Sequence, residues 1–308
     1  MDGTQATASD LASVEATLRD GLARGDAVLL AATPTLRRLL AYRDEALLND
    51  EVVARVRGML HDLARQVLEA QDGPAITAED LVAALADDSV LLSHVHALAV
   101  EGRLAERLEA EAGIDPVLSP LLEQLIAAGD EVVAGAAMAA MAAQASFIQN
   151  QRRMTLPIAE LPADLLRSVI AAWCGTIADP GRAEAAEAAL RTGVGEDPAR
   201  FDLLTRLVMR TGSNASGALD VATAGLAVFA TALALTAGQA RDVTVLSLAG
   251  PQSGRLVLAL RAAGLTPAAV GAQFVLFHRD ASPGEDVSGL RADRATAVLA
   301  TVNPPRRG

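Results

Sequence analysis

The chain has 308 residues, 66 of them alanine, and its 26 basic residues are all arginine because the sequence contains no lysine. Without lysine it can build neither a Walker-type phosphate loop nor a Schiff-base active site. The formal net charge of −12 repels phosphate backbones and anionic lipid, so we expect no nucleic acid and no membrane as partners. The single cysteine, Cys174, excludes an intramolecular disulfide and any multi-thiolate metal site.

The N-terminus favours a cytoplasmic protein. Residues 1–10 are polar and lack the basic region and apolar core of a secretory signal. The lone thiol fits a reducing compartment, and its neighbour Trp173 indicates an inert, buried cysteine. We expect no metal and no cofactor.

Apolar residues recur at helical spacing along the first part of the chain, and capping residues separate the runs. Thr77 and Asp80 have the form of a capping box, and Gly113 is typical of a helix end. A hairpin follows, its two arms separated by Gly129-Asp130. The expected helices cover residues 11–25, 34–42, 50–68, 77–86, 88–112, 116–128 and 131–153.

Two prolines, Pro157 and Pro162, forbid a continuous helix after the hairpin. The second half then repeats the helical pattern. We expect helices at 163–177, 181–191, 198–209, 215–235, 253–263 and 267–277. The sequence therefore predicts an N-terminal helical domain (1–153), a proline-containing linker (154–162), a C-terminal helical domain (163–281) and a polar segment (282–308) that ends in a disordered tail.

One segment has a strand-like pattern. Residues 242–248 alternate β-branched positions and run into Gly250 and an apolar stretch, the strand–turn–helix order of a nucleotide-binding crossover. The glycine spacing does not match a dinucleotide fingerprint, and no second strand is evident. We therefore favour a short helix with a Gly-Pro break. The predicted fold class is all-α, with helical hairpins packed as a two-part helical array that is HEAT-like in places.

Two stretches, Val132–Gln151 and Val221–Ala240, each run twenty residues without a charge. That is the length of a membrane span, but both are made of small and polar residues more than of Leu, Ile and Phe. We therefore expect packed core helices of a soluble protein. Gly135, Ala139 and Ala142 in the first stretch leave room for another backbone, which suggests self-association as a homodimer.

The four histidines offer one chemical hypothesis. His61-Asp62 has the pattern of a phospho-accepting histidine beside an acid, so histidine phosphotransfer through His61 is the alternative function, with an ordinary helix histidine as the simpler interpretation. His94 and His96 are two apart, roughly 200° around a helix, and cannot chelate one metal. His94 shares a face with Glu101, too far for a hydrogen bond without a bridging group, which favours a structural role. His278 falls near a helix end.

Arg152 and Arg153 end the second hairpin arm next to the proline linker. Arginine binds carboxylates and phosphates with two parallel hydrogen bonds, so these residues are candidates for an anion or partner contact. A small-molecule sensor that binds an anion here is the second alternative function. The simpler interpretation is that they complement the helix dipole and pair with Glu160 or Asp164.

Several runs together resemble the domain of unknown function 2336 family of alphaproteobacteria. They are LSHVHALAVE at 92–101, DPVLSPLL at 115–122, AAQASFIQNQRRM at 142–154, LPIAELP at 156–162 and, from the closing helices, GRL to RAAGL at 254–265. The resemblance covers the central and C-terminal two thirds of the chain. It implies a cytoplasmic, all-helical, HEAT-like protein and carries over no reaction, cofactor or catalytic residue.

The leading functional prediction is a non-enzymatic interaction or regulatory scaffold built from stacked helices, with no catalytic residues. Helical arrays present elongated surfaces to partners. The sequence does not identify the protein partner.

Overall fold

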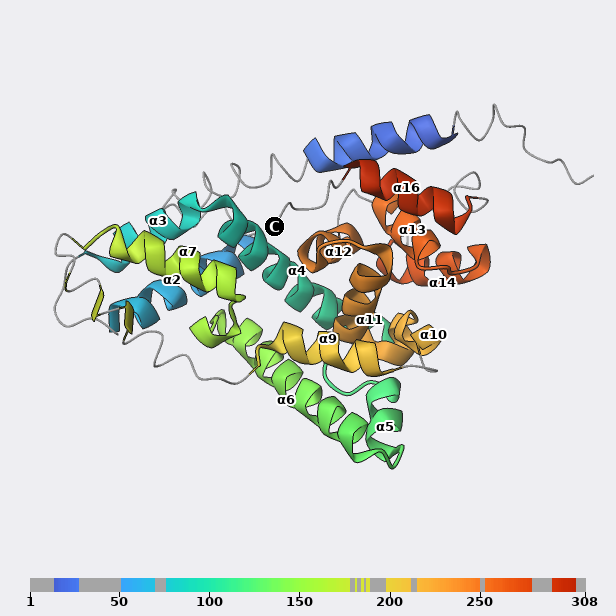
Figure 1. Cartoon of the computed structure of the whole chain (residues 1–308), viewed down its shortest axis with the longest axis horizontal. Coiled ribbons are helices and arrows are strands. Elements are labelled where there is room, and N and C mark those ends of the chain that lie inside the picture. Colours follow the sequence, from blue (N-terminus) through green and yellow to red (C-terminus); the bar gives the residue numbers. More distant parts are fainter. Residues whose placement is uncertain are drawn as a thin grey trace, which may run out of the picture.

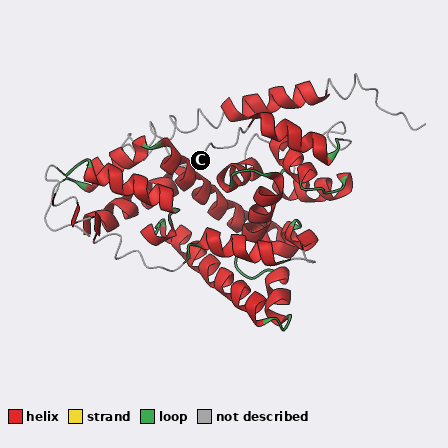
Figure 2. Ribbon diagram, in the orientation of Figure 1, coloured by secondary structure: helices red, strands yellow, loops and turns green. Residues whose placement is uncertain are grey.

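The computed structural model describes residues 14–27, 51–69, 76–177, 181, 184–185, 187–188, 198–211, 215–249, 253–278 and 290–302. Within these ranges the chain is helical, with turns and short loops and no strand (Figure 2). The predicted all-α fold is therefore confirmed for the described part. The helix expected at 34–42 and the tail expected at 303–308 lie outside it.

After a helix at 14–27, the first part of the molecule is built from α2 (Glu51–Glu69), α3 (Ala78–Asp87), α4 (Ser89–Ala112), α5 (Pro120–Ala127) and α6 (Glu131–Arg153). A short 3-10 turn, η2 (Ile158–Glu160), leads to α7 (Ala163–Cys174). The rest comprises α9 (Arg200–Arg210), α10 (Ala215–Ala218), α11 (Val221–Ala237), α12 (Arg241–Ala249), α13 (Ser253–Ala262), α14 (Pro267–Phe277) and α16 (Ala292–Val302).

Local capping chemistry fixes several of these boundaries as the sequence predicts. Thr77 and Asp80 form the capping box of α3, each satisfying a backbone amide of the other. The carboxylate of Asp88 accepts hydrogen bonds from the first amides of α4, and Gly113 ends that helix in the left-handed conformation. The strand-like segment is helical, since α12 covers residues 241–249.

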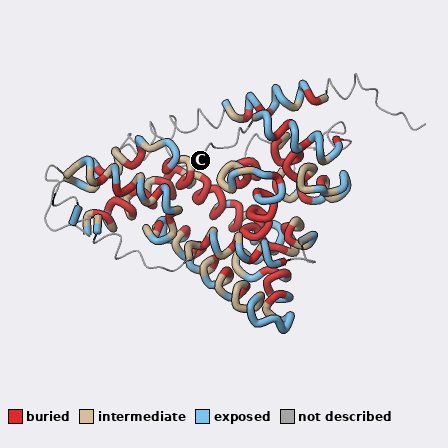
Figure 3. The backbone as a smooth tube through the Cα atoms, in the orientation of Figure 1, coloured by how far each residue is buried: buried red, intermediate tan, exposed pale blue. Residues whose placement is uncertain are grey.

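The apolar side chains form one hydrophobic core that extends from Leu22 to Leu299. Its centre is α11, which packs against α4, α5, α9, α12 and α13 and is buried along most of its length (Figures 1 and 3). The core also crosses the predicted linker, because α6 packs on α9, and α7 packs on α3 and α4. The charge-free stretch in α11 is thus a core helix, as expected.

The other charge-free stretch is not a core helix, and this expectation was wrong. Helix α6 packs on α5 and α9 along one face and extends away from the rest of the molecule (Figure 1). Only 28% of its most apolar 18-residue stretch is buried. By length and composition α6 is the one described helix that could cross a membrane, or one of up to three if two sharply bent helix pairs each count as a single span.

One expected helix start and one expected continuous helix were also wrong, for reasons of capping. Helix α5 begins at Pro120, because Asp115 Oδ1 accepts the amides of Val117 and Leu118 at 2.7 and 2.8 Å and holds the preceding residues in a turn. The helix expected at 215–235 is split into α10 and α11 because Asp220 caps a new helix start. Helix α16 lies in the segment 282–308, which was expected to be polar; its Ala295, Val298 and Leu299 are buried where it packs on α13.

Candidate functional site

A buried ion cluster lies where α4, α9 and α12 meet. The carboxylate of Glu101, only 1% exposed, accepts two hydrogen bonds from Arg200 at 2.8 and 3.0 Å and two from Arg241 at 2.7 and 2.8 Å. Burial by itself raises the pKa of Glu101, but the charges and hydrogen bonds of the two arginines outweigh it and hold the pKa well below its usual range. The carboxylate is therefore ionised and fully occupied at neutral pH.

Aromatic rings enclose the two guanidinium groups. Arg200 lies 3.7 Å from the ring centroid of Phe147, and Arg200 and Arg241 both lie over Phe201, at 4.6 and 4.5 Å. These contacts stabilise the cations inside the core. His94 meets the edge of the Phe201 ring, with centroids 5.6 Å apart.

His94 also joins α4 to α12. Its Nδ1 lies 2.9 Å from Asp242 Oδ2, and its buried Nε2 has no hydrogen-bond partner among the described residues. His94 and Glu101 are thus connected indirectly, because the Phe201 ring that His94 contacts also lies against Arg241, a partner of Glu101. This placement agrees with the predicted structural role, and no group of three His, Cys, Asp or Glu in the described ranges could hold a metal.

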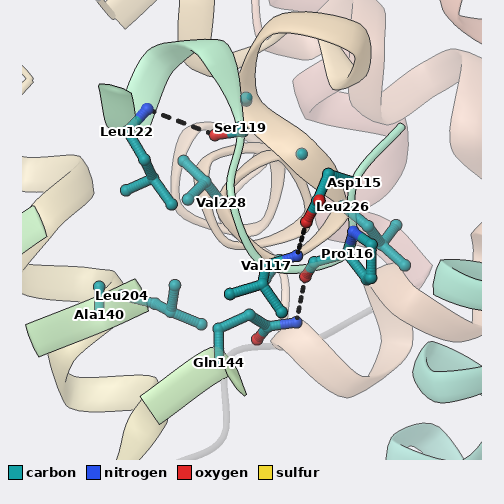
Figure 4. Close-up of a pocket in the computed structure, with 13 residues that line it drawn as sticks. Asp115, Pro116, Val117, Ser119, Leu122, Ala140, Gln144, Leu204, Leu226 and Val228 are labelled. Atoms are coloured by element: carbon teal, nitrogen blue, oxygen red, sulfur yellow. Dashed lines mark hydrogen bonds between the residues drawn. The ribbon is translucent and has the colours of Figure 1, made fainter. Parts of the chain in front are cut away.

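Gln144 connects the ion cluster to the loop between α4 and α5. Its Oε1 accepts a hydrogen bond from Arg200 at 2.8 Å, and its Nε2 donates to the carbonyl of Pro116 at 3.0 Å (Figure 4). The hydroxyl of Ser119 accepts from the amide of Leu122 and ends the loop. Side chains therefore hold the loop at its middle, where Gln144 binds Pro116, and at its end, where Ser119 caps α5.

A small, partly open cavity lies against this loop. Its volume is about 10 Å³, room for roughly one water molecule. Gly225 forms part of its wall, and a Cβ at that position would lie 3.2 Å from Ser119 Cβ. The cavity is too small for a substrate, and residues of both the loop and the core helix α11 line it (Figure 4).

A larger groove, of about 400 Å³, lies on the outside of the same loop. Val117, Leu118 and Ile148 supply apolar lining, and the charged residues Glu109, Asp115 and Arg152 also line it, although Asp115 already accepts the amides of Val117 and Leu118. Below we call it the Arg152 groove; its full lining comprises Glu109, Asp115, Pro116, Val117, Leu118, Ala145, Ile148, Gln149 and Arg152.

The two arginines that were expected to form a contact site differ in their surroundings. Both are exposed at the end of α6, but only Arg152 lines the groove. Within the described ranges neither forms an ion pair with Glu160 or Asp164. Instead Glu160 accepts a hydrogen bond from Asn150 at 3.2 Å. Burial raises the pKa of Glu160, although the charge of Arg200 and this hydrogen bond oppose the shift.

His61 is half-buried on α2, and its neighbour Asp62 is already engaged. Asp62 accepts hydrogen bonds from Arg65, Gln66 and the amide of Leu156, at 2.6, 2.8 and 3.0 Å. Together with Gln66 it holds the proline-containing segment against α2. Phosphotransfer through His61 stays a prediction, but Asp62 has a structural task that competes with any role as its base.

Burial shifts the pKa values of two further side chains, Cys174 and His278, toward their uncharged forms. Burial raises the pKa of the half-buried Cys174, which keeps the thiol protonated and unreactive at neutral pH. Burial, with the charge of Arg107, lowers the pKa of His278. The neutral imidazole is therefore favoured there.

Sequence reasoning missed the ion cluster. Its one local signal was an acid on the apolar face of α4, where Glu101 follows Leu98 by three positions and precedes Leu108 by seven. Its partners lie 99 and 140 positions away, beyond the reach of any spacing rule.

Comparison of the chain with protein-family models, curated proteins and solved structures gives no match.

Proposed function

We propose that this chain is a non-enzymatic interaction protein whose partner docks on the outer face of α6, defined by Gly135, Met138, Ala142 and Gln149. The observation that carries the proposal is the exposure of a long charge-free helix. Residues 132–151 contain no charge, yet Met138 is 49% and Val132 62% exposed. Exposed apolar surface of this extent is typical of interaction sites.

The shape of this face suits another helix. The four residues are spaced by three, four and seven positions and so share one side of α6. Gly135 and Ala142 have small or absent side chains that allow close approach, while Met138 supplies a flexible apolar contact of the kind enriched at interfaces. An amphipathic helix of a partner could align with this stripe.

The polar interior supports a scaffold more than a catalyst. Glu101 accepts four hydrogen bonds from two arginines, so it is unavailable for proton transfer. The proposal keeps the expected cytoplasmic location and the resemblance to the domain of unknown function 2336 family, whose HEAT-like fold would present such a surface.

The test is affinity capture from native lysate with three versions of the chain: unaltered, Met138→Glu, and Val90→Glu. Val90 is 45% exposed at the start of α4 and is the matched control for adding a charge to an exposed apolar position. We expect a specific protein to be retained by the unaltered chain and by Val90→Glu, and lost with Met138→Glu because a charge on this face must be desolvated.

Three results would contradict the proposal. The first is capture that is unaffected by Met138→Glu, and the second is no capture at all. The third is flotation of the unaltered chain, but not of Met138→Glu, with phosphatidylcholine vesicles, which would assign the face to a lipid surface.

A further inference from the structure

We infer that the Arg152 groove is the contact of this chain with a second copy of itself. The inference rests on the proposed function, because the groove opens onto the outer face of α6 through Gln149, which belongs to both. It adds a second copy of the chain as a partner at the neighbouring groove and gives the register in which that copy binds.

The Arg152 groove has opposite charges on one surface. Glu109, at the end of α4, and Arg152, at the end of α6, both line the groove and are both exposed. Neither forms an ion pair with the other or with any other described residue, although many charged side chains of this chain pair locally, such as Arg65 with Asp62. A groove that presents both an unpaired cation and an unpaired anion can form opposite-charge pairs with its own copy.

Two-fold symmetry satisfies both charges at once. In such a contact the same patch faces itself, so that residue i meets residue j of the other copy and j meets i. Arg152 would then face the partner's Glu109, and Glu109 would face the partner's Arg152. The apolar lining of Val117, Leu118 and Ile148 supplies the surface to be buried, and the charges set the register.

The groove is also preorganised. Asp115 holds the amides of Val117 and Leu118 in a fixed turn, and Gln144 holds the carbonyl of Pro116. Its lining loop therefore loses little conformational freedom when a copy binds, which favours association.

Sedimentation velocity over a wide concentration range tests the inference with Arg152→Glu, Glu109→Arg, their equimolar mixture and the double variant. Each single variant places like charges opposite each other, and we expect its self-association to weaken by roughly tenfold or more. The mixture and the double variant restore both opposite-charge pairs, and we expect them to recover the dimer. Arg153→Glu, one position away but outside the groove, is the matched control and should behave as the unaltered chain.

An unaltered chain that stays monomeric at every concentration would overturn the inference, and so would single variants that associate normally or a mixture that fails to recover. If Met138→Glu abolishes association while both charge reversals leave it intact, the copies meet on the outer face of α6 and not in the groove. Failure of the docking proposal is seen separately, in the affinity capture.

Discussion

Glu101 shows how a single buried charge is made acceptable inside a helical core. A carboxylate that is removed from water loses several kcal/mol of solvation unless partners replace it. Here Arg200 and Arg241 supply four hydrogen bonds, and Phe147 and Phe201 cover the cations. The cluster therefore ties together three helices in one defined arrangement.

Glu101→Gln tests this role. The substitution keeps the shape but leaves two buried guanidinium groups facing a neutral amide, so we expect a loss of about 3–5 kcal/mol in the free energy of unfolding. Glu111→Gln, at an exposed position of the same helix, should change it by less than about 1 kcal/mol. Urea unfolding at pH 7 measures both, and equal losses would contradict the role of Glu101.

The pH dependence of the free energy of unfolding tests the same role of Glu101. Because the pKa of Glu101 is lowered on folding, its contribution is complete above the unfolded value of about 4.3 and is lost as the pH falls below it. The stability difference between the unaltered chain and Glu101→Gln should stay constant from pH 7 to pH 5 and shrink below about pH 4. A difference that grows on acidification would contradict this assignment.

Residue-level prediction from the sequence succeeds where the partner is nearby. Thr77 with Asp80, Asp88 and Gly113 act within one helical turn, and their roles could be predicted from spacing. The partners of Glu101 could not, because their positions depend on how α9 and α12 pack on α4. The Arg152 groove is intermediate, since the sequence indicates the cation but not its placement beside Glu109.

At the scale of elements, α11 shows that a continuous apolar run in the sequence need not form a continuous helix. Gly225 has φ 73° and ψ 160°, which interrupts the helical conformation inside the segment. This region of backbone space is essentially restricted to glycine. The break lets α11 pass Ser119 closely. Neither the alanine-rich composition nor the hydrophobic pattern of residues 215–235 predicts this break.

Gly225→Ala tests whether the break is needed. The added Cβ would meet Ser119 Cβ at 3.2 Å in a conformation that alanine rarely adopts, and we expect a loss of roughly 3 kcal/mol in the free energy of unfolding. Gly238→Ala is the control, because Gly238 has φ 64° but open space around it; it should lose only about 1 kcal/mol. Equal losses from thermal unfolding would show that the contact with Ser119 is unimportant.

At the scale of the whole molecule, the described helices on either side of the predicted linker share one hydrophobic core. Glu101 lies before the linker, and both of its arginine partners lie after it. Asp62 and Gln66 of α2 hold the backbone of Leu156 and Ile158 within the linker itself. The proline signal thus marks a stop in the helix, whereas domain independence depends on contacts that no local signal reports.

The two halves should therefore fold only together. A fragment of residues 1–153 leaves Glu101 without a cation and uncovers the face of α6 that packs on α9, and the fragment 154–308 leaves α11 without α4 and α5. We expect neither fragment to unfold cooperatively when it is heated. In the full chain, the circular dichroism transition and the fluorescence transition of the buried Trp173, its single tryptophan, should coincide. A cooperative transition of fragment 1–153 at the melting temperature of the full chain would instead establish the division at residues 154–162, because an independent domain keeps its stability when its neighbour is removed.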